Sequence, residues 1–306
     1  MPSPSDATVL VCSRNRPEML RDGLASILAS TPAETEVLVV DSASDTDETR
    51  LVTLEAGARY TRAGKGLSVA RNAGITTADR PIVVFTDDDC RPTTGWIESL
   101  IAPFADPRVS AVTGRMLDHT TDAHAPYARA ERYIEPVSGL DAGHGAVMAF
   151  RRDVLLRIGG FDDMMGAGQH LAGAEDLDIF IRLLRAGTHV VHDAHSVVLH
   201  ANTRVGEAYV ELHHGYGLGL GALVGKWLRL DPLFGLRIGW RLTRRTGARI
   251  ARGTRRHHDT RHDRSLLAGM AQGAWEVRGI PIVGERFAGA GSGAPIPVLR
   301  AEGVTR

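Results

Sequence analysis

The first 115 residues alternate short apolar runs with segments that have the spacing of amphipathic helices. This alternation is the pattern of successive βαβ units, which build a mostly parallel sheet. The runs are continuously apolar and do not alternate with polar residues, so helices should cover both faces of that sheet. We therefore predict an α/β fold with a mostly parallel sheet flanked by helices. The expected strands are 8–12, 36–40, 58–60, 81–86 and 109–113, and the expected helices are 19–28, 51–56, 67–75 and 96–104.

The segment 116–204 is less regular but continues the mixed pattern. Residues 164–173 are rich in Gly and Ala and poor in bulky side chains, so we expect a loosely packed, mobile lid there. Gly159-Gly160 is a typical helix stop. The expected helices are 127–134, 151–158 and 177–186, and the expected strands are 144–150, 188–192 and 196–200.

The composition changes after residue 204. Lysine and arginine outnumber aspartate and glutamate by 16 to 8 in residues 205–306, whereas residues 1–204 hold 20 against 28. Residues 206–229 are Gly-rich and apolar, without a strand pattern. In residues 233–256, eight arginines recur mostly at spacings of three and four, which places them on one stripe of a helix. We therefore divide the chain into a domain of residues 1–204 and a helical, basic extension of residues 205–306.

The expected strand 81–86 ends in three consecutive carboxylates, Asp87, Asp88 and Asp89. Unpaired buried carboxylates are costly, so the cluster should face water, a cation or a ligand that carries one. Ligands of open α/β sheets bind at the carboxyl ends of the strands, where this cluster lies. Carboxylate oxygens are hard ligands that suit Mg²⁺ or Mn²⁺. The alternatives are a solvated acidic turn and an aspartyl-phosphatase pattern, which requires Thr or Val at the position of Arg91.

A second acidic pair, Glu175-Asp176, opens the expected helix 177–186. The helix dipole favours carboxylates at this end, so capping alone would explain the pair. Such a carboxylate can also take a proton from a hydroxyl group as a general base. The two acidic sites together suggest metal-assisted transfer chemistry.

Three features bear on location. Cys12 and Cys90 are too few for a disulfide framework, so we expect free thiols, as in a reducing cytosol. Residues 1–7 lack the basic and apolar regions of a signal peptide. No apolar stretch reaches the length of about 18 residues that a spanning helix needs. We therefore expect a cytoplasmic protein, with peripheral contact to the inner face of a membrane left open.

Seven segments of the chain resemble, in order, the motifs of the family 2 glycosyltransferases of GT-A fold. They are VLVCSRNRP at 9–17, VLVVD at 37–41, GLSVARNAGI at 66–75, VVFTDDDCRPTTGW at 83–96, GAVMAFRRDVL at 145–155, GGFD at 159–162 and EDLDIFIRLLRAG at 175–187. The resemblance covers residues 7–200 and implies a Rossmann-like GT-A sheet. It also implies an inverting, metal-dependent transfer of a sugar from a nucleoside diphosphate sugar to an acceptor hydroxyl.

The resemblance assigns roles to particular residues. Asp87 would approach the donor ribose and Asp89 would bind Mn²⁺ or Mg²⁺, while the triplet leaves Asp88 able to replace either. His200 ends the last strand, where many GT-A enzymes place a histidine that completes the metal shell. The other matched positions are Ser13, Arg14, Arg16, Asp41 and Arg71 for the donor, Asp176 as general base, and Trp96, Gly145 and Glu175 for the acceptor.

Asp41 matches the aspartate that binds the base of the donor nucleotide. A carboxylate accepts from the ring N–H of uracil or thymine, so a UDP- or dTDP-sugar is favoured. The alternative for Asp41 is an Asx turn at the end of its strand. His189, His192 and His195 are spaced three residues apart and come before His200. Side chains three residues apart lie on opposite faces of a strand, so His189, His192 and His195 cannot converge on a zinc ion.

Two other functions stay open for the first domain. It could be an inactive GT-A-like binding protein whose basic tail associates with membrane. It could also be a nucleotidyltransferase, although that class wants a Gly-rich loop after the first strand and residues 13–17 contain no glycine. The arginine stripe either touches anionic membrane or is a solvated helix face that supports a homodimer or folds over the acceptor site. Few aromatics in the tail and the acidic front argue against nucleic acid.

Overall fold

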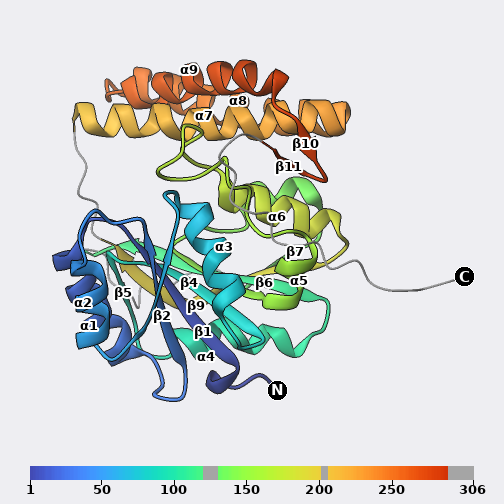
Figure 1. Ribbon diagram of the computed structural model, residues 1–306. Coiled ribbons are helices and arrows are strands. Elements are labelled where there is room, and N and C mark those ends of the chain that lie inside the picture. Colours follow the sequence, from blue (N-terminus) through green and yellow to red (C-terminus); the bar gives the residue numbers. More distant parts are fainter. Residues whose placement is uncertain (120–129, 201–205, 289–306) are drawn as a thin grey trace, which may run out of the picture.

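The structure is a computed structural model that describes residues 1–119, 130–200 and 206–288. Figure 1 shows a central sheet with helices on both faces and, above it, a separate layer of helices. That layer is formed by α7 (Glu207–Leu230), α8 (Pro232–Arg255) and α9 (Arg261–Glu276). The chain thus has the predicted α/β fold with a helical C-terminal extension.

The sheet order is β3-β2-β1-β4-β8-β6-β9-β5, and β7 pairs with β9. The strands are β1 (Ala7–Ser13), β2 (Glu36–Ser42), β3 (Arg59–Ala63), β4 (Ile82–Asp87), β5 (Cys90–Pro92), β6 (Val109–Asp118), β7 (Glu131–Tyr133), β8 (Val147–Arg151) and β9 (His189–His200). The block β3-β2-β1-β4 is parallel, and β6 is parallel to β9. The carboxyl ends of β1, β2 and β4 therefore lie at one edge of the sheet, where their terminal polar residues meet.

Helices cover both faces of the sheet, as the continuous apolar runs predicted. The helices of this domain are α1 (Pro17–Ser30), α2 (Glu48–Glu55), α3 (Leu67–Thr77), α4 (Trp96–Ile101), α5 (Arg152–Arg157) and α6 (Glu175–Arg185). In β1, Val9 and Val11 pack into the core cluster that holds Leu20 of α1. Leu10 packs into the opposite cluster, which holds Ile75 of α3. Alternate side chains of one strand thus supply two cores.

Two expectations for the middle of the chain were wrong. The described part of the segment 127–134 is not helical, because Glu131–Tyr133 forms β7 and pairs antiparallel with β9. Tyr133 is buried in a core cluster, so pairing and burial override the local helical spacing. The first three residues of that segment lie outside the described chain. The expected strands 188–192 and 196–200 are one strand, β9, which follows β6 through register shifts.

The loop 164–173 is packed, contrary to the expectation of loose packing. Met165 and Leu171 are buried in a third hydrophobic cluster with residues of α6 and α7. The Ser68 hydroxyl donates to the carbonyl oxygen of Met165 at 2.7 Å. Two apolar side chains suffice to anchor this loop because helices α6 to α9 and neighbouring segments supply the rest of the cluster.

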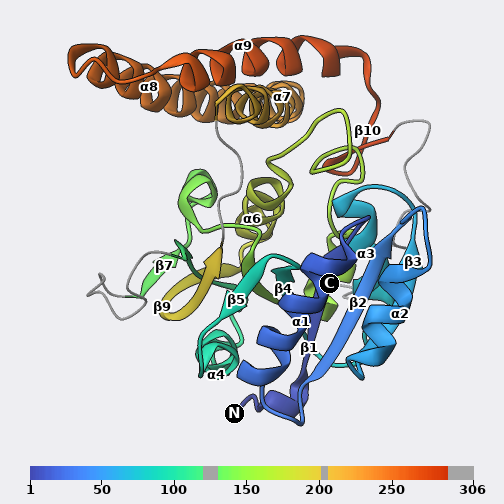
Figure 2. The ribbon, with the colours of Figure 1, turned by 90° about the vertical axis from the view of Figure 1, so that its left-hand side faces the viewer.

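The glycines of the C-terminal region allow two helices to approach closely. α9 lies along α7 in parallel orientation, and α8 returns antiparallel to both (Figure 2). A Cβ added at Gly221 of α7 would lie 2.1 Å from the carbonyl oxygen of Met270. One added at Gly273 of α9 would lie 2.1 Å from the carbonyl oxygen of Leu218. The Gly-rich composition of residues 206–229 is therefore a requirement of helix packing.

A buried cluster of charges joins the helical layer to the sheet domain. Lys226 of α7 is fully buried, and its Nζ lies 2.5 Å from Oδ1 of Asp178 and 3.1 Å from Oδ2 of Asp162. Arg182 Nε donates to Asp178 Oδ2 at 2.9 Å. The backbone N–H of Phe287, in the hairpin β10 (Ile282–Val283) and β11 (Arg286–Phe287), donates to Asp162. The extension is thus fastened to α6, the helix that begins with Glu175.

The C-terminal region carries two of the sequence-based expectations, a domain boundary and the lack of a membrane-spanning helix. The boundary expected near residue 204 falls in residues 201–205, outside the described chain. Among the described residues, no helix is both long enough and apolar enough to cross a membrane.

Candidate active site

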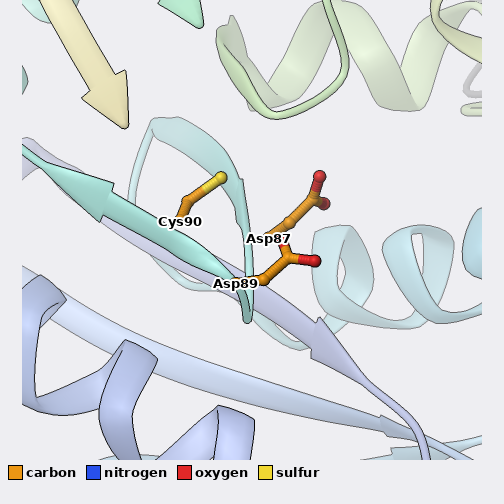
Figure 3. A group of neighbouring side chains, drawn as sticks. All are labelled: Asp87, Asp89 and Cys90. Carbon is orange, nitrogen blue, oxygen red and sulfur yellow. The ribbon is translucent and has the colours of Figure 1, made fainter. Parts of the chain in front are cut away.

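The carboxylates of Asp87 and Asp89 lie next to each other at the end of β4 (Figure 3). Ligand atoms of these two residues and of Cys90 all lie within 4.8 Å of one another. The Cys90 thiol is buried, and burial raises the pKa of this thiol, which keeps it protonated. The two carboxylates, and not the protonated thiol, are therefore the groups of this cluster that can offer charged ligand atoms to a cation.

Asp88 points the other way and is fully buried. The Ser13 hydroxyl donates to its Oδ2 at 2.6 Å, and Arg16 Nη2 lies 2.5 Å from its Oδ1. Burial raises the pKa of Asp88 to about 6, although Arg16 and Ser13 act to lower it. The polar groups of Asp88 and Ser13 thus bind each other beneath the site, and the donor-binding roles predicted for these two residues stay predictions. The register of the triplet is therefore Asp87 and Asp89 outward and Asp88 inward.

His200 lies beside Asp89 because β5 pairs with the end of β9, where Cys90 is opposite His200. His200 Nε2 is 3.4 Å from Asp89 Oδ1. Interaction with Asp89 raises the pKa of His200. Burial acts to raise the pKa of Asp89, but His200 and Arg16 outweigh burial, so this pKa lies below its ordinary value. The two residues predicted to share a metal are thus neighbours.

The donor set fits a divalent cation. Oδ1 of Asp89 is buried and has no hydrogen bond from the described residues. Asp87 offers further oxygen atoms, and His200 offers an imidazole nitrogen. Two carboxylates and an imidazole are ligands that Mn²⁺ accepts, and Mg²⁺ accepts the carboxylates.

Arg71 of α3 connects the Asp triplet with the second acidic pair. Its Nη1 lies 2.9 Å from Glu175 Oε1, and its Nη2 lies 3.8 Å from Asp87 Oδ1. Nη2 also donates to the carbonyl oxygen of Gly145 at 3.1 Å. The guanidinium is buried, and its Cζ lies 5.8 Å from the centroid of the Phe85 ring and 5.3 Å from that of the Phe161 ring. Arg71 was predicted to bind the donor, and this role stays a prediction; its polar contacts within the described residues include Glu175, Asp87 and Gly145.

Glu175 and Asp176 differ in their access to solvent. Glu175 is buried against Arg71, and burial, followed by the charge of Asp176, raises the pKa of Glu175. Asp176 is partly exposed; its Oδ2 accepts from Gly145 N–H at 3.0 Å and its Oδ1 from Leu177 N–H at 2.8 Å. Two backbone donors thus orient Asp176 at the start of α6. Gly145 and Glu175, predicted to bind the acceptor, contact Arg71 and Asp176, and their acceptor-binding roles stay predictions.

Asp41 ends β2 and is fully buried. Its Oδ1 accepts from Ser44 N–H, three residues on, at 2.8 Å, so this carboxylate also holds the loop that follows β2. Its Oδ2 accepts from the Tyr60 hydroxyl at 2.9 Å and lies 3.4 Å from Arg62 Nη1. Tyr60 and Arg62 were missed by the sequence analysis. The parallel pairing of β2 with β3 sets Arg62 opposite Asp41. The order of the two strands along the chain was the feature of the sequence from which this neighbour could have been predicted.

Two other predicted residues have different surroundings. Arg14 Nε donates to the carbonyl oxygen of Ala43 at 3.2 Å, and Arg14 pairs with Asp45 in the loop after β2. Arg14 therefore lies against the loop that follows Asp41. Trp96 is the first residue of α4. Its side chain is fully buried in the core, and its Nε1 donates to the Thr31 hydroxyl. No part of this side chain reaches the surface, and the acceptor role predicted for Trp96 stays a prediction.

Sequence comparison relates the chain to known proteins. The family model "Glycosyl transferase family 2" matches residues 8–157. A pre-mycofactocin glycosyltransferase of Mycobacterium tuberculosis is 28% identical over 215 residues, which are 65% of this chain and 43% of that protein. A glucosyl-dolichyl phosphate glucuronosyltransferase of Haloferax volcanii is 24% identical over 63% of this chain and 68% of its own length. The chain thus spans less than half the length of the mycobacterial relative.

Structure comparison relates the fold to solved enzymes. The mannosyltransferase of Pyrobaculum calidifontis in complex with GDP-Man and Mn²⁺ superposes with a TM-score of 0.61 at 22% identity, over 90% of both chains. GalNAc-T7 with UDP, GalNAc and Mn²⁺ superposes with a TM-score of 0.53 at 18% identity, over 67% of this chain and 45% of that one. Both share the sheet and flanking helices described above. Residues 8–157 belong to glycosyl transferase family 2, and the chain has the GT-A fold.

Proposed function

We propose that the protein is an inverting, metal-dependent glycosyltransferase that moves a hexose from a nucleoside diphosphate sugar to an acceptor hydroxyl. The observation that carries the proposal is the position of Arg71, which lies within 3.8 Å of both Asp87 and Glu175. One buried guanidinium thereby holds the Asp triplet and the start of α6 around a common site. A metal cluster and an accessible carboxylate are thus available to the same substrate.

Asp89, His200 and Asp87 would hold the Mn²⁺ or Mg²⁺ ion. When bound, the ion neutralises the diphosphate and stabilises it as the leaving group. The protein groups around it fix the ligands: Arg16 pairs with Asp89 at 3.3 Å, and the β5–β9 pairing sets the position of His200. The Mn²⁺-bound complexes of the two structural relatives support this assignment.

The edge formed by β1, β2 and β3 would bind the nucleotide. Asp41 Oδ2 is a candidate acceptor for a base N–H, with Tyr60 and Arg62 beside it and Arg14 nearby. Uracil and thymine each offer one ring N–H, which favours a UDP- or dTDP-sugar. Because the archaeal structural relative was solved with GDP-Man, GDP belongs in the same test.

Asp176 would act as the general base. Its carboxylate is oriented by two backbone N–H groups and stays partly exposed, whereas Glu175 is buried. It would take the proton of the acceptor hydroxyl during in-line attack on the anomeric carbon. A single displacement of this kind inverts the anomeric configuration.

Calorimetry with UDP, dTDP and GDP, each with and without Mn²⁺, tests the binding step. We expect one nucleotide to bind in a metal-dependent manner, and we expect its sugar conjugate to release free nucleoside diphosphate when an acceptor is present. Binding of none of the three would remove the proposed donor class. Release of pyrophosphate would instead identify a nucleotidyltransferase, and binding without turnover on any tested acceptor would favour an inactive binding protein.

A further inference from the structure

We propose that the outward face of α8 binds the surface of an anionic membrane. Leu233, Leu236 and Trp240 have relative exposures of 81%, 61% and 70%. Their spacings of three and four residues place them on one strip of the helix, here called the interfacial strip. Large apolar side chains gathered on an exposed helix face mark an interaction surface.

Unpaired positive charges lie along the same face. Arg237, Arg244 and Arg255 follow the interfacial strip at helical spacing, and Arg256 comes directly after the last residue of α8. All four side chains are exposed, and within residues 1–119, 130–200 and 206–288 none of them has an acidic partner. Residues 232–255 contain no Asp or Glu, so no carboxylate on α8 offsets these charges.

The remaining arginines of α8 have internal partners, which separates the two sides of the helix. Arg241 and Arg245 both pair with Asp141 of the sheet domain, Arg245 at 2.6 Å. Arg249 pairs with Asp263 of α9 at 2.7 Å, and Arg252 Nε donates to the carbonyl oxygen of Ala248 at 3.3 Å. The sequence-based expectation that all eight arginines share one role is therefore corrected. Among the residues that the structure describes, the outward arginines have no ion-pair partner and can bind a ligand.

The chemistry of the face favours a lipid surface over other partners. A helix with exposed Leu and Trp beside Arg is typical of segments that lie in the headgroup region, with apolar side chains inserted and cations near lipid phosphates. Nucleic acid would neutralise the arginines but leave Leu233 and Leu236 in water. A second copy would bring the same cationic face against itself in a two-fold dimer, which like-charge repulsion opposes.

Vesicle flotation tests the proposal without any substrate, so its outcome is independent of the proposed transferase activity. The wild-type chain should float with phosphatidylcholine–phosphatidylglycerol vesicles and not with phosphatidylcholine alone. The triple variant Arg237→Gln, Arg244→Gln, Arg255→Gln should lose about a hundredfold in partition coefficient, since each basic residue contributes about fivefold. The variant Leu233→Ser, Leu236→Ser, Trp240→Ser should also lose binding and should unfold at the same temperature as wild type.

A charge-matched control separates this face from general electrostatic attraction. Arg21, Arg80 and Arg157 are exposed on the sheet domain, and their combined change to Gln removes the same charge. This control should float like wild type. Brominated lipids should quench Trp240, and the quenching should disappear in Trp240→Phe.

Three outcomes of the vesicle experiments would overturn the proposal, and two other measurements could do so as well. The vesicle outcomes are equal recovery from neutral and anionic vesicles, equal losses in the α8 triple-arginine variant and the control, and retention of binding by the Leu/Trp variant. Binding of a nucleic-acid duplex with no flotation would also overturn it. Sedimentation as a dimer that dissociates in the Leu/Trp variant would assign the face to a second copy instead.

Discussion

His200 Nε2 lies 3.4 Å from Asp89 Oδ1 because the chain reverses direction directly after the Asp triplet and pairs with the last strand of the sheet. β5 is only three residues long, yet it sets Cys90 opposite His200 and so fixes the histidine against the acidic cluster. The proposed metal site therefore depends on a strand pairing between distant parts of the sequence. Its ligands can be tested one at a time.

Replacing Asp89 with Asn should abolish Mn²⁺-dependent binding of a nucleoside diphosphate, because the change removes a charged ligand from the ion. His200→Ala should weaken binding less, since it removes one neutral ligand. Calorimetry with and without Mn²⁺ measures both effects. Asp79→Asn, which alters an exposed carboxylate after α3, should bind like wild type. Unchanged affinity in Asp89→Asn would remove the metal assignment.

Replacing Asp176 with Asn should lower turnover by about 10²–10⁴-fold, which is the usual contribution of a general base. Donor affinity should stay nearly constant, because Asp176 contacts the backbone of Gly145 and Leu177 and none of the residues proposed to bind the nucleotide. Single-turnover kinetics and calorimetry separate the two quantities. Asp153→Asn, in exposed α5, serves as control. The assignment fails if the Asp176 variant keeps more than a tenth of wild-type turnover.

The sequence predicted most of the sheet because its strands are buried on both faces and read as apolar runs. It missed β5, since Cys90–Pro92 has no pattern of its own and becomes a strand only by pairing with β9. The sequence-based prediction also placed residues 131–133 in a helix. These residues form β7, which is a strand because it pairs with β9. Local spacing does not report such edge pairings.

The site was predicted at the level of motifs and less well at the level of contacts. Three adjacent carboxylates do not reveal which one turns inward, and the partners that bury Asp88 lie after another strand. Trp96 matched a motif position, but its helix packs on the sheet and buries it. Arg71 looked like a phosphate ligand, because nothing in its own helix indicates that Glu175 will lie against it.

Replacing Lys226 with Met should destabilise the fold by about 3–5 kcal/mol, because it leaves the buried carboxylates of Asp162 and Asp178 without their cation. Urea unfolding measures the free energy of unfolding. Arg237→Met, on the exposed face of α8, removes the same charge and should change it by less than about 0.5 kcal/mol. Equal stability of the two variants would contradict the buried cluster.

Acid should weaken the same cluster. Burial acts to raise the pKa of Asp178, but Lys226 and Arg182 outweigh burial, so this pKa lies below its ordinary value. A carboxylate with a lowered pKa in the folded chain stabilises it above the unfolded pKa of about 3.9. That stability is lost as the pH falls through the lower, folded-state pKa. Between about pH 5 and pH 3, the free energy of unfolding should therefore fall more steeply for wild type than for Asp178→Asn. Parallel curves would show that Asp178 does not titrate as described.

Replacing Gly221 with Ala should destabilise the chain by about 1–3 kcal/mol, the usual effect of forcing extra volume into a packed interior. The added Cβ would lie 2.1 Å from the carbonyl oxygen of Met270, so α7 and α9 would have to separate. Gly247→Ala is the matched control, because that glycine lies in α8 with nothing within 4 Å of an added Cβ. There the change should stabilise the helix by about 0.5–1 kcal/mol. Urea unfolding of both variants should give shifts of opposite sign, and shifts of the same sign and size would mean that α7 and α9 do not pack at their glycines.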